Sequence, residues 1–295
     1  MSLSLPNHYV IQFANTIQLL LQQKESKFSP YVMRGNHVGK QASPVDQIGS
    51  ISMQPVIGRY QPIGRVDAPV DRRWVIPSDF DLNQLIDSFD AIRLLLDPKS
   101  SYVQNALFAA NRQMDDLIIA ALFGTAKTGE QGGTSTTFPA ANQVAVNFQS
   151  SGNVGLTVAK LREAKRLLMS YQVDLDSDPL TCFVTAKQHD DLLREIQVTS
   201  MDFNDTPVMV EGRVTRFLGI NIVHCERLAN DATPYRRVPV FAKSGMYLGL
   251  WNDIETDISQ RKDLQSLPWQ AYLKMSAGST RLEENKVIEI KCNEA

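Results

Sequence analysis

The chain has 295 residues, of which 43% are hydrophobic and 21% are charged, and its formal net charge at pH 7 is −2. This composition is typical of a globular protein with a sizeable core. A near-neutral chain argues against a protein whose main task is to coat nucleic acid, because that task needs a basic surface. The sequence has no apolar run of about 18 residues, so we expect no transmembrane helix. The interrupted apolar stretch near its start is not typical of a secretory signal.

Charge is distributed unevenly along the chain. Residues 1–78 carry eight Lys/Arg and four acidic residues, whereas residues 79–295 carry 22 and 28, so the two segments have net charges of +4 and −6. Three cysteines lie far apart, at Cys182, Cys225 and Cys292, and no Cys-x-x-Cys pair is present. We therefore expect reduced, structural thiols.

The first 78 residues predict a helix, an arm and a projecting hairpin. Residues 9–23 place apolar side chains at helical spacing, which predicts a short amphipathic helix. Residues 24–54 show no periodicity, as expected of an extended arm. Residues 51–76 mix β-branched and aromatic residues with three prolines, which favours an exposed edge hairpin. Such a hairpin is marginal alone in water, so we expect it to dock on a partner.

Residues 77–98 are interpreted as a helix that ends at an Asp-Pro pair. This interpretation depends on apolar residues that recur with helical spacing. These residues are Leu82, Leu85, Ile86, Phe89, Ile92 and Leu95.

Residues 102–123 predict the longest helix of the chain. Ser101 and Gln104 have the spacing of a capping box, and Gly124 is placed to end the helix. About 22 residues at 1.5 Å each give a length of roughly 33 Å, which predicts a spine for the fold. Within it, Asp115 and Asp116 are interpreted as an exposed helical face paired with Arg112.

The chain beyond residue 155 alternates helices and strands, which predicts a compact α/β unit followed by closing strands. A second capping box, Thr185 with Gln188, opens one of the helices. The predicted elements are a helix at 157–171, a strand at 180–186, a helix from 185, a hairpin at 213–228, and strands within 238–259, 269–282 and 285–293.

Catalytic and metal-binding motifs are absent from the sequence. Neighbouring side chains at His189–Asp191 and at His224 and Cys225 point in different directions, and neither set has a zinc spacing. There is no nucleophile elbow, zinc-protease helix or dinucleotide fingerprint. We therefore expect no catalytic, cofactor or metal site, and no enzyme.

A glycine-rich loop after the long helix has part of the spacing of a nucleotide-binding loop. Gly124 and Gly129 bracket four residues, but Glu130 occupies the position of the phosphate-binding lysine, and the loop follows a helix instead of opening one. A carboxylate there would repel phosphate. The loop is interpreted as a flexible connector.

The order of these elements resembles that of the major capsid proteins of tailed phages with the Hong Kong 97-type fold. The resemblance runs from about residue 51 to the C-terminus. The similar stretches are "DSFDAIRLLLDPKSSYVQNALFAANRQMDDLIIAALFGTAKTG", "TCFVTAKQHDDLL", "GRVTRFLGINIV" and "GLWNDIETDISQRKDLQSLPWQAYLKMSAGSTRLEENKVIEIKC".

This resemblance implies an α+β fold in four parts. They are an N-terminal arm at about 1–50, an extended β-hairpin loop at about 51–78, a peripheral domain at 79–140 and 237–295 that holds the spine helix, and an α/β axial domain at 141–236. The implied function is structural: a major capsid protein that self-assembles as pentamers and hexamers into the icosahedral shell around the genome of a tailed double-stranded DNA phage.

In such shells the extended loop lies across a neighbouring subunit, and a basic loop on an acidic neighbour would have complementary charge. The residues expected to make this contact are Arg59, Arg65, Asp67, Asp71, Arg72 and Arg73. Because no lysine occurs between Lys40 and Lys99, we do not expect the covalent crosslinks that some members form through a loop lysine.

The resemblance also implies partners and a location. They are a separate scaffolding protein, a portal, weak non-specific contact with packaged double-stranded DNA, and no membrane; a decoration protein is left open. The location is the virion capsid, made and assembled in the cytoplasm of a bacterial host. Two alternatives stay open: an encapsulin-like compartment shell and, less favoured, a nucleotide-binding enzyme.

Overall fold

The computed structural model describes residues 22–39, 42–55, 58–60, 64–86, 99–195, 198, 212–231, 235–265 and 267–294. The helix predicted at 9–23 lies almost wholly outside these residues, as does the second half of the helix predicted at 77–98. The chain divides into two compact units. The first comprises Met1–Ser26, Ser78–Met114 and Asn252–Ala277, and the second comprises Lys27–Pro77, Asp115–Trp251 and Gly278–Ala295.

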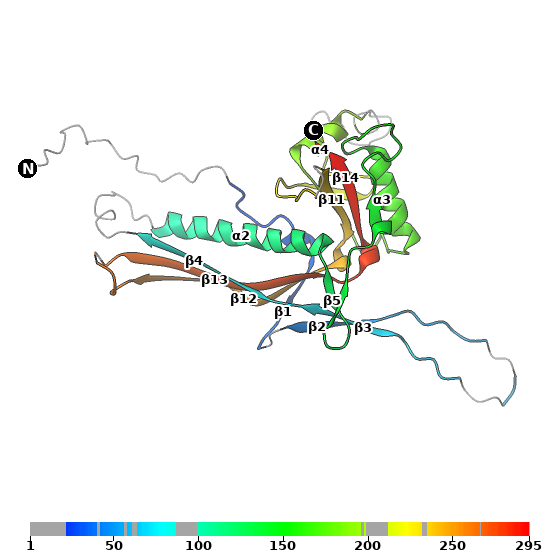
Figure 1. Cartoon of the computed structure of the whole chain (residues 1–295), viewed down its shortest axis with the longest axis horizontal. Coiled ribbons are helices and arrows are strands. Elements are labelled where there is room, and N and C mark those ends of the chain that lie inside the picture. Colours follow the sequence, from blue (N-terminus) through cyan, green and yellow to red (C-terminus); the bar gives the residue numbers. More distant parts are fainter. Residues whose placement is uncertain are drawn as a thin grey trace, which may run out of the picture. The chain divides into compact units, whose positions relative to one another are not determined.

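The first unit contains the start of the spine helix and a set of long strands (Figure 1). Helix α2 spans Lys99–Phe123, which confirms the predicted long helix. It begins two residues before Ser101, so Ser101 lies inside the helix and is not its N-cap. Strand β12 spans Met246–Gln260 and β13 spans Trp269–Arg281, and both continue into the second unit.

The prediction of a helix at 77–98 is wrong for its first half, because Ser78–Ile86 forms strand β4. This strand pairs antiparallel with β13, from Ile86 opposite Trp269 to Ser78 opposite Ala277. Its residues alternate between more exposed and less exposed positions, as in a strand with one covered face. The helical spacing was real, but the hydrogen-bond partners that decide the structure lie about 190 residues away in the sequence.

The second unit is built on a six-stranded mixed sheet with strand order β7-β14-β11-β8-β10-β9. Helices α3 and α4 contribute residues to the apolar core that this sheet forms. The bounds are β7 Gln143–Val144, β8 Leu180–Val184, β9 Arg216–Phe217, β10 Ile220–His224, β11 Tyr235–Ala242, β14 Val287–Asn293, α3 Val158–Ser170 and α4 Ala186–Leu193.

The sequence signals for this unit are largely confirmed. Thr157 is the N-cap of α3, and Thr185 forms the predicted capping box with Gln188 at the start of α4. Strands β9 and β10 form the predicted hairpin, whose two turn residues have positive φ. The alternation predicted along β10 holds for two buried isoleucines but ends before His224, which is exposed.

Strands β11 and β14 belong to this sheet, where β11 pairs with both β14 and β8. The sequence-based assignment groups 237–295 with the spine helix, and the residues of that helix from Asp115 onward lie in the same unit as these two strands. Both are rich in buried residues, and adjacent ones such as Val240 and Phe241 of β11 face opposite sides of the sheet. A strand buried on both faces shows no polar alternation that would reveal which sheet it joins.

A second sheet, with order β2-β3-β5-β6, lies at the base of the extended hairpin. Strands β2 (Ser43–Ile48) and β3 (Val70–Val75) pair along their whole length. The hairpin therefore starts earlier than the predicted residue 51, within the segment assigned to the arm. None of the described residues between Gly49 and Pro69 belongs to a strand.

The glycine-rich loop forms part of this sheet, so its interpretation as a flexible connector is wrong. Strands β5 (Ala126–Thr128) and β6 (Thr134–Thr136) form a hairpin, and β5 also pairs with β3. Gly129 and Gly132 have φ values of 86° and 73°, which side chains other than glycine rarely adopt. The Nε1–H group of Trp74 donates to the carbonyl of Gly129 at 2.7 Å, which fixes the turn against the base of the extended hairpin.

The remaining elements are short. Strand β1 (Met33–Asn36) pairs parallel with the start of β12 in the second unit. No helix among the described residues is both long and apolar enough to cross a membrane. The 3₁₀ turns are η1 Ser29–Tyr31, η2 Ala140–Asn142, η3 Lys243–Gly245 and η4 Glu284–Lys286.

Candidate assembly surfaces

The arm is anchored to the spine helix by a buried carboxylate, Asp115. Its side-chain oxygens accept the backbone N–H groups of Lys27 at 2.9 Å and Phe28 at 3.1 Å, and the residue is fully buried. The ring of Phe28 stacks on Phe183 with 3.6 Å between centroids. The interpretation of Asp115 as part of an exposed ion-paired face is therefore wrong.

The other polar residues of the spine helix also differ from prediction. Within the first unit, Arg112 donates to the side chain of Gln22 at 2.7 Å and to the carbonyl of Gln23 at 3.2 Å. Within the second unit, Asp116 pairs with Arg227 through two hydrogen bonds, one of them 2.9 Å long. The predicted pairing of Arg112 with the adjacent aspartates is not formed.

At the base of the extended hairpin, Arg73 makes a bidentate ion pair with Glu284, with N–O distances of 2.8 and 2.7 Å. The two side chains are only 7% and 18% exposed. Arg73 therefore differs from prediction: it is bonded within its own chain and leaves almost no surface for a neighbouring subunit. This pair ties the hairpin to the segment after β13.

Glu284 also lies close to Arg281, a fully buried arginine that caps the C-terminal end of the spine helix. One nitrogen of its guanidinium group donates to the carbonyls of Leu122 at 2.8 Å and Gly124 at 3.0 Å. Burial lowers the pKa of Arg281, and the nearby Arg73 acts in the same direction. The base of the hairpin and the end of the helix thus share one buried charge cluster.

The other charged residues predicted for intersubunit contact lie on the exposed hairpin, but most are paired within it. Arg72 donates to Asp46, its cross-strand partner, at 2.5 Å. Arg65 pairs with Asp67 at 2.7 Å, and both side chains are highly exposed. Asp71 accepts the backbone N–H of Arg72 at 2.7 Å.

Arg59 is exposed and completes the predicted set. Without Arg73, the hairpin from residue 43 to 75 carries three arginines (59, 65, 72) and three aspartates (46, 67, 71). Its exposed charge is therefore balanced, unlike the net charge of +4 for the whole front segment. Charge alone is a weak driving force for docking this hairpin.

Apolar side chains are the more distinctive feature of the hairpin. Of the fourteen large hydrophobic residues that are exposed among the described residues, seven lie between residues 48 and 76. The side chains of Met53 and Tyr60 are as exposed as in an extended peptide. Six of them lie in the hairpin and one follows it directly: Ile48, Ile51, Met53, Tyr60, Val66 and Val70, and then Ile76.

One face of the sheet in the first unit is acidic. Lys274 of β13 lies opposite Asp81 and makes an ion pair with Glu255 at 3.1 Å. A hollow of about 330 Å³ lies beside Lys274 and is also lined by Asp79 and Asp81. Strand alternation places Asp253 and Asp257 on the same side of β12 as Glu255, so this face carries five acids against one lysine.

Comparison with known proteins identifies the family. Residues 5–294 match the model of the family described as phage capsid protein. The chain belongs to the phage capsid protein family. Its role is structural: it is a major capsid protein that forms the shell. No curated protein sequence matches it significantly.

Solved structures with the same fold are also capsids. Similar chains occur in the capsid of cyanophage P-SCSP1u (17% identity, 96% of this chain and 94% of that chain, TM-score 0.73) and in cyanophage Pam1 (14%, 96% and 96%, 0.73). Another occurs in the capsid of Ralstonia phage GP4 (12%, 99% and 97%, TM-score 0.70). The α+β capsid fold expected from the sequence is confirmed, and the family match favours a phage shell over an encapsulin-like compartment.

A buried lysine and two buried cysteines of the capsid protein have surroundings that suit a structural role. Lys160 donates its ammonium hydrogens to the carbonyls of Val154, Gly155 and Lys291, at 2.8 to 2.9 Å. Burial raises the pKa of Cys225 to about 11 and of Cys292 to about 12. No group of three or more His, Cys, Asp or Glu residues within the described part of the chain is placed to hold a metal ion.

The spacing of Asp115 in the sequence indicates that this residue is buried, although it was interpreted as exposed. Asp115 lies three, four and seven residues before Ile118, Ile119 and Leu122, all of which are buried, so it occupies the apolar stripe of the helix. A carboxylate in an apolar stripe must find hydrogen-bond donors to be buried. That argument predicts that Asp115 anchors another segment, but the sequence alone does not show which groups donate to it.

Proposed function

We propose that this capsid protein assembles as pentamers and hexamers into an icosahedral shell that encloses the genome of a tailed double-stranded DNA phage. In this proposal residues 43–75 form the extended loop and dock on a neighbouring copy. The observation that supports it is the concentration of exposed apolar side chains on the hairpin. Burying each such side chain stabilises a contact by about 1.5–3 kcal/mol.

The docking surface that we propose is the acidic sheet face of the first unit in the neighbouring copy. Because the exposed charges of the hairpin are balanced, we assign the affinity to apolar contacts and the orientation to charge. Arg59, which has no acidic partner in the hairpin ladder, and the exposed pair of Arg65 and Asp67 are the side chains best placed to meet that face. Arg73 is excluded from this set.

The domain roles follow from the sheets. We assign β4, β12, β13 and the spine helix to a peripheral domain, and the six-stranded sheet with α3 and α4 to an axial domain that includes β11 and β14. The arm then comprises the residues before β2. Asp115 holds this arm through the bonds already described.

The proposed role is structural and non-enzymatic. A separate scaffolding protein and a portal are the expected partners, and assembly in the bacterial cytoplasm precedes release of the virion. With a net charge of −2, the shell needs only weak contact with the enclosed DNA.

Electron microscopy and sedimentation of the expressed chain test this proposal. Wild-type protein is expected to form closed shells or related open assemblies. Replacing Ile51→Asn and Met53→Gln together should lower the assembly yield while leaving the helical content of the subunit unchanged. The matched control is Met169→Gln, at another exposed methionine, which lies on α3 away from the hairpin.

Two results would contradict the proposal. The first is a wild-type chain that stays monomeric at all concentrations and salt conditions. The second is an assembly yield that falls equally in the hairpin variant and in the α3 control, because that outcome would show a general effect of exposed polar substitutions.

A further inference from the structure

The second unit contains a hollow of about 490 Å³ at the carboxyl ends of two parallel strands. Strands β8 and β10 pair in parallel, α4 begins just after β8, and His224 is the last residue of β10. In open α/β sheets, ligands bind in the crevice outside the carboxyl ends of the strands. The hollow therefore lies where this architecture usually places a ligand.

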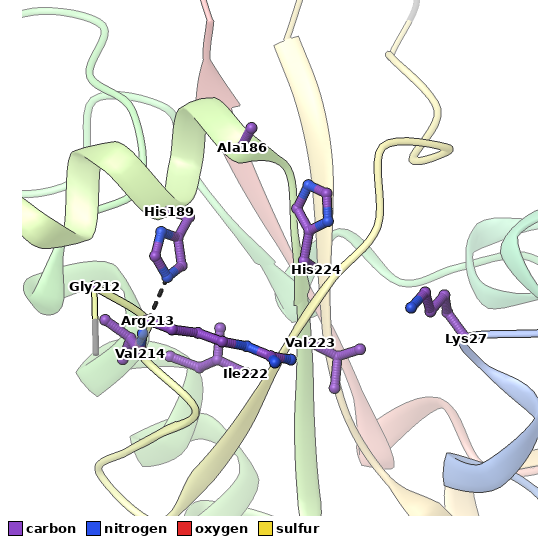
Figure 2. Close-up of a pocket in the computed structure, with 9 residues that line it drawn as sticks. All are labelled: Lys27, Ala186, His189, Gly212, Arg213, Val214, Ile222, Val223 and His224. Atoms are coloured by element: carbon purple, nitrogen blue, oxygen red, sulfur yellow. Dashed lines mark hydrogen bonds between the residues drawn. The ribbon is translucent and has the colours of Figure 1, made fainter. Parts of the chain in front are cut away.

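Two basic side chains line this hollow from separate segments of the chain. Lys27 comes from the arm and Arg213 from the segment before β9, and both are exposed. Figure 2 shows the two side chains extending toward each other from opposite sides. No ion pair joins either of them to an acidic residue in the part of the chain that the structure describes.

Two histidines complete the polar lining. The Nε2 atom of His189 accepts the backbone N–H of Val214 at 3.0 Å, so its Nδ1–H is free to donate (Figure 2). Burial lowers the pKa of His189, with His224 and Arg213 acting in the same direction. All four titratable side chains that line the hollow are basic.

A carboxylate beside His224 already has partners. Glu226 lies 2.8 Å from Nε2 of His224 and accepts the backbone N–H of Ala186 at 2.6 Å, at the start of α4. It therefore occupies the helix N-terminus and leaves Lys27 and Arg213 without a counter-ion among the described residues. An anion in the hollow would supply one.

We propose that this hollow binds a phosphate group. The planar guanidinium of an arginine and the ammonium of a lysine, approaching from opposite sides, suit an anion with oxygens directed to several sides. The source of this phosphate group that we infer is the phosphodiester backbone of nucleic acid. This choice of source rests on the proposed function. Free polyphosphate carries the same phosphate groups, and the test distinguishes it from nucleic acid.

The test measures binding of a fluorescent double-stranded DNA oligonucleotide to the unassembled full-length chain at several salt concentrations. Arg213→Gln and Lys27→Gln should each weaken binding about tenfold, the equivalent of one charge-assisted hydrogen bond. Each should also reduce the slope of log affinity against log salt by about 0.9. The matched control, Arg216→Gln, removes an exposed arginine of β9 that does not line the hollow and should not share the tenfold loss.

Two further probes identify the source. If pyrophosphate binds in an Arg213-dependent manner and displaces the oligonucleotide, the phosphate site is supported for both sources. If pyrophosphate binds in this way but the oligonucleotide does not, the site is supported with free phosphate as its ligand. Unchanged urea midpoints in Arg213→Gln and Lys27→Gln show that any loss of binding is not unfolding.

Three results would overturn the inference. They are no saturable binding of either phosphate probe, equal losses in the control variant, and equally tight Arg213-dependent binding of polyglutamate, which would assign the hollow to acidic peptides. Shell formation seen by electron microscopy is a separate measurement. A shell that forms without phosphate binding would leave the proposed function standing and remove only this site.

Discussion

Replacing Asp115→Asn tests whether the buried carboxylate holds the arm. The carboxylate accepts two backbone N–H groups, from Lys27 and Phe28. Asparagine has nearly the same shape, but one of its two terminal atoms is an NH₂ group, which cannot accept. One of the two bonds must therefore be lost, and a donor then faces a donor.

The size of the effect follows from this geometry. A hydrogen bond to a charged group contributes about 1.5–3 kcal/mol, and the other bond weakens when the charge is removed. We therefore expect the local free energy of opening to fall by about 2–3 kcal/mol. At 1.4 kcal/mol per factor of ten, hydrogen exchange at the amides of Lys27 and Phe28 should accelerate by about 30- to 140-fold.

Hydrogen exchange measured by mass spectrometry on the unassembled subunit is the assay. The matched control is Asp116→Asn, one residue further along the helix, whose ion pair with Arg227 is 37% and 36% exposed. This control should cost about 1 kcal/mol or less and leave exchange at residues 27 and 28 unchanged. Unchanged exchange at these amides in Asp115→Asn, or equal acceleration in both variants, would refute the anchoring argument.

Four further predictions concern other parts of the chain. Arg73→Gln should lower the free energy of unfolding of the isolated subunit by about 3 kcal/mol, because it leaves a carboxylate buried without its partner. Arg72→Gln, on the exposed side of the hairpin, should lower it far less, and urea denaturation measures both. Gly132→Ala should destabilise the fold by about 1–2 kcal/mol, since φ is +73° and the new Cβ would lie 3.1 Å from Trp74, while Gly133→Ala, with no atom within 4 Å, serves as control. The free energy of unfolding should fall as pH rises above 9.0, because unfolded thiols ionise near that value while the folded state holds the pKa of Cys292 at about 12. Urea titrations at several pH values measure this fall, and Cys292→Ala should make it less steep. Shells boiled in denaturant without reductant should run as a single band near the chain mass of 33.0 kDa, and a ladder of larger bands would reveal a crosslink.

Local signals in the sequence predicted the parts of the fold that depend on neighbouring residues. The capping box of Thr185 and Gln188 and the helical period of 102–123 act within a few residues, and the structure contains both helices. Residues 78–86 fit two periods at once, and only their pairing with β13 makes them a strand. The second half of strand β11, from Val238 to Ala242, is buried throughout, so its sequence does not show which strands lie beside it.

The candidate surfaces also combine features that the sequence predicted with features that depend on residues far apart in the chain. The sequence indicated a projecting, proline-rich hairpin, and its exposed apolar residues are visible in the structure. It could not show that Arg73 turns inward to Glu284, because these residues are 211 positions apart. Nor could it bring Lys27 and Arg213 to one hollow, since that depends on how the arm crosses the α/β unit.

The extended hairpin has a consequence for shell geometry. Its ladder ends at Ile48 and Val70, and one further bond joins the N–H of Gly49 to the carbonyl of Pro69 at 2.7 Å. Beyond that bond, the described residues make no ladder that would impose a single curvature. A large icosahedral shell places identical chains in non-identical surroundings. In the docking proposed above, a segment that is rigid at its base and has no ladder bonds among its described residues beyond it would let one sequence meet neighbours at several angles at small energetic cost.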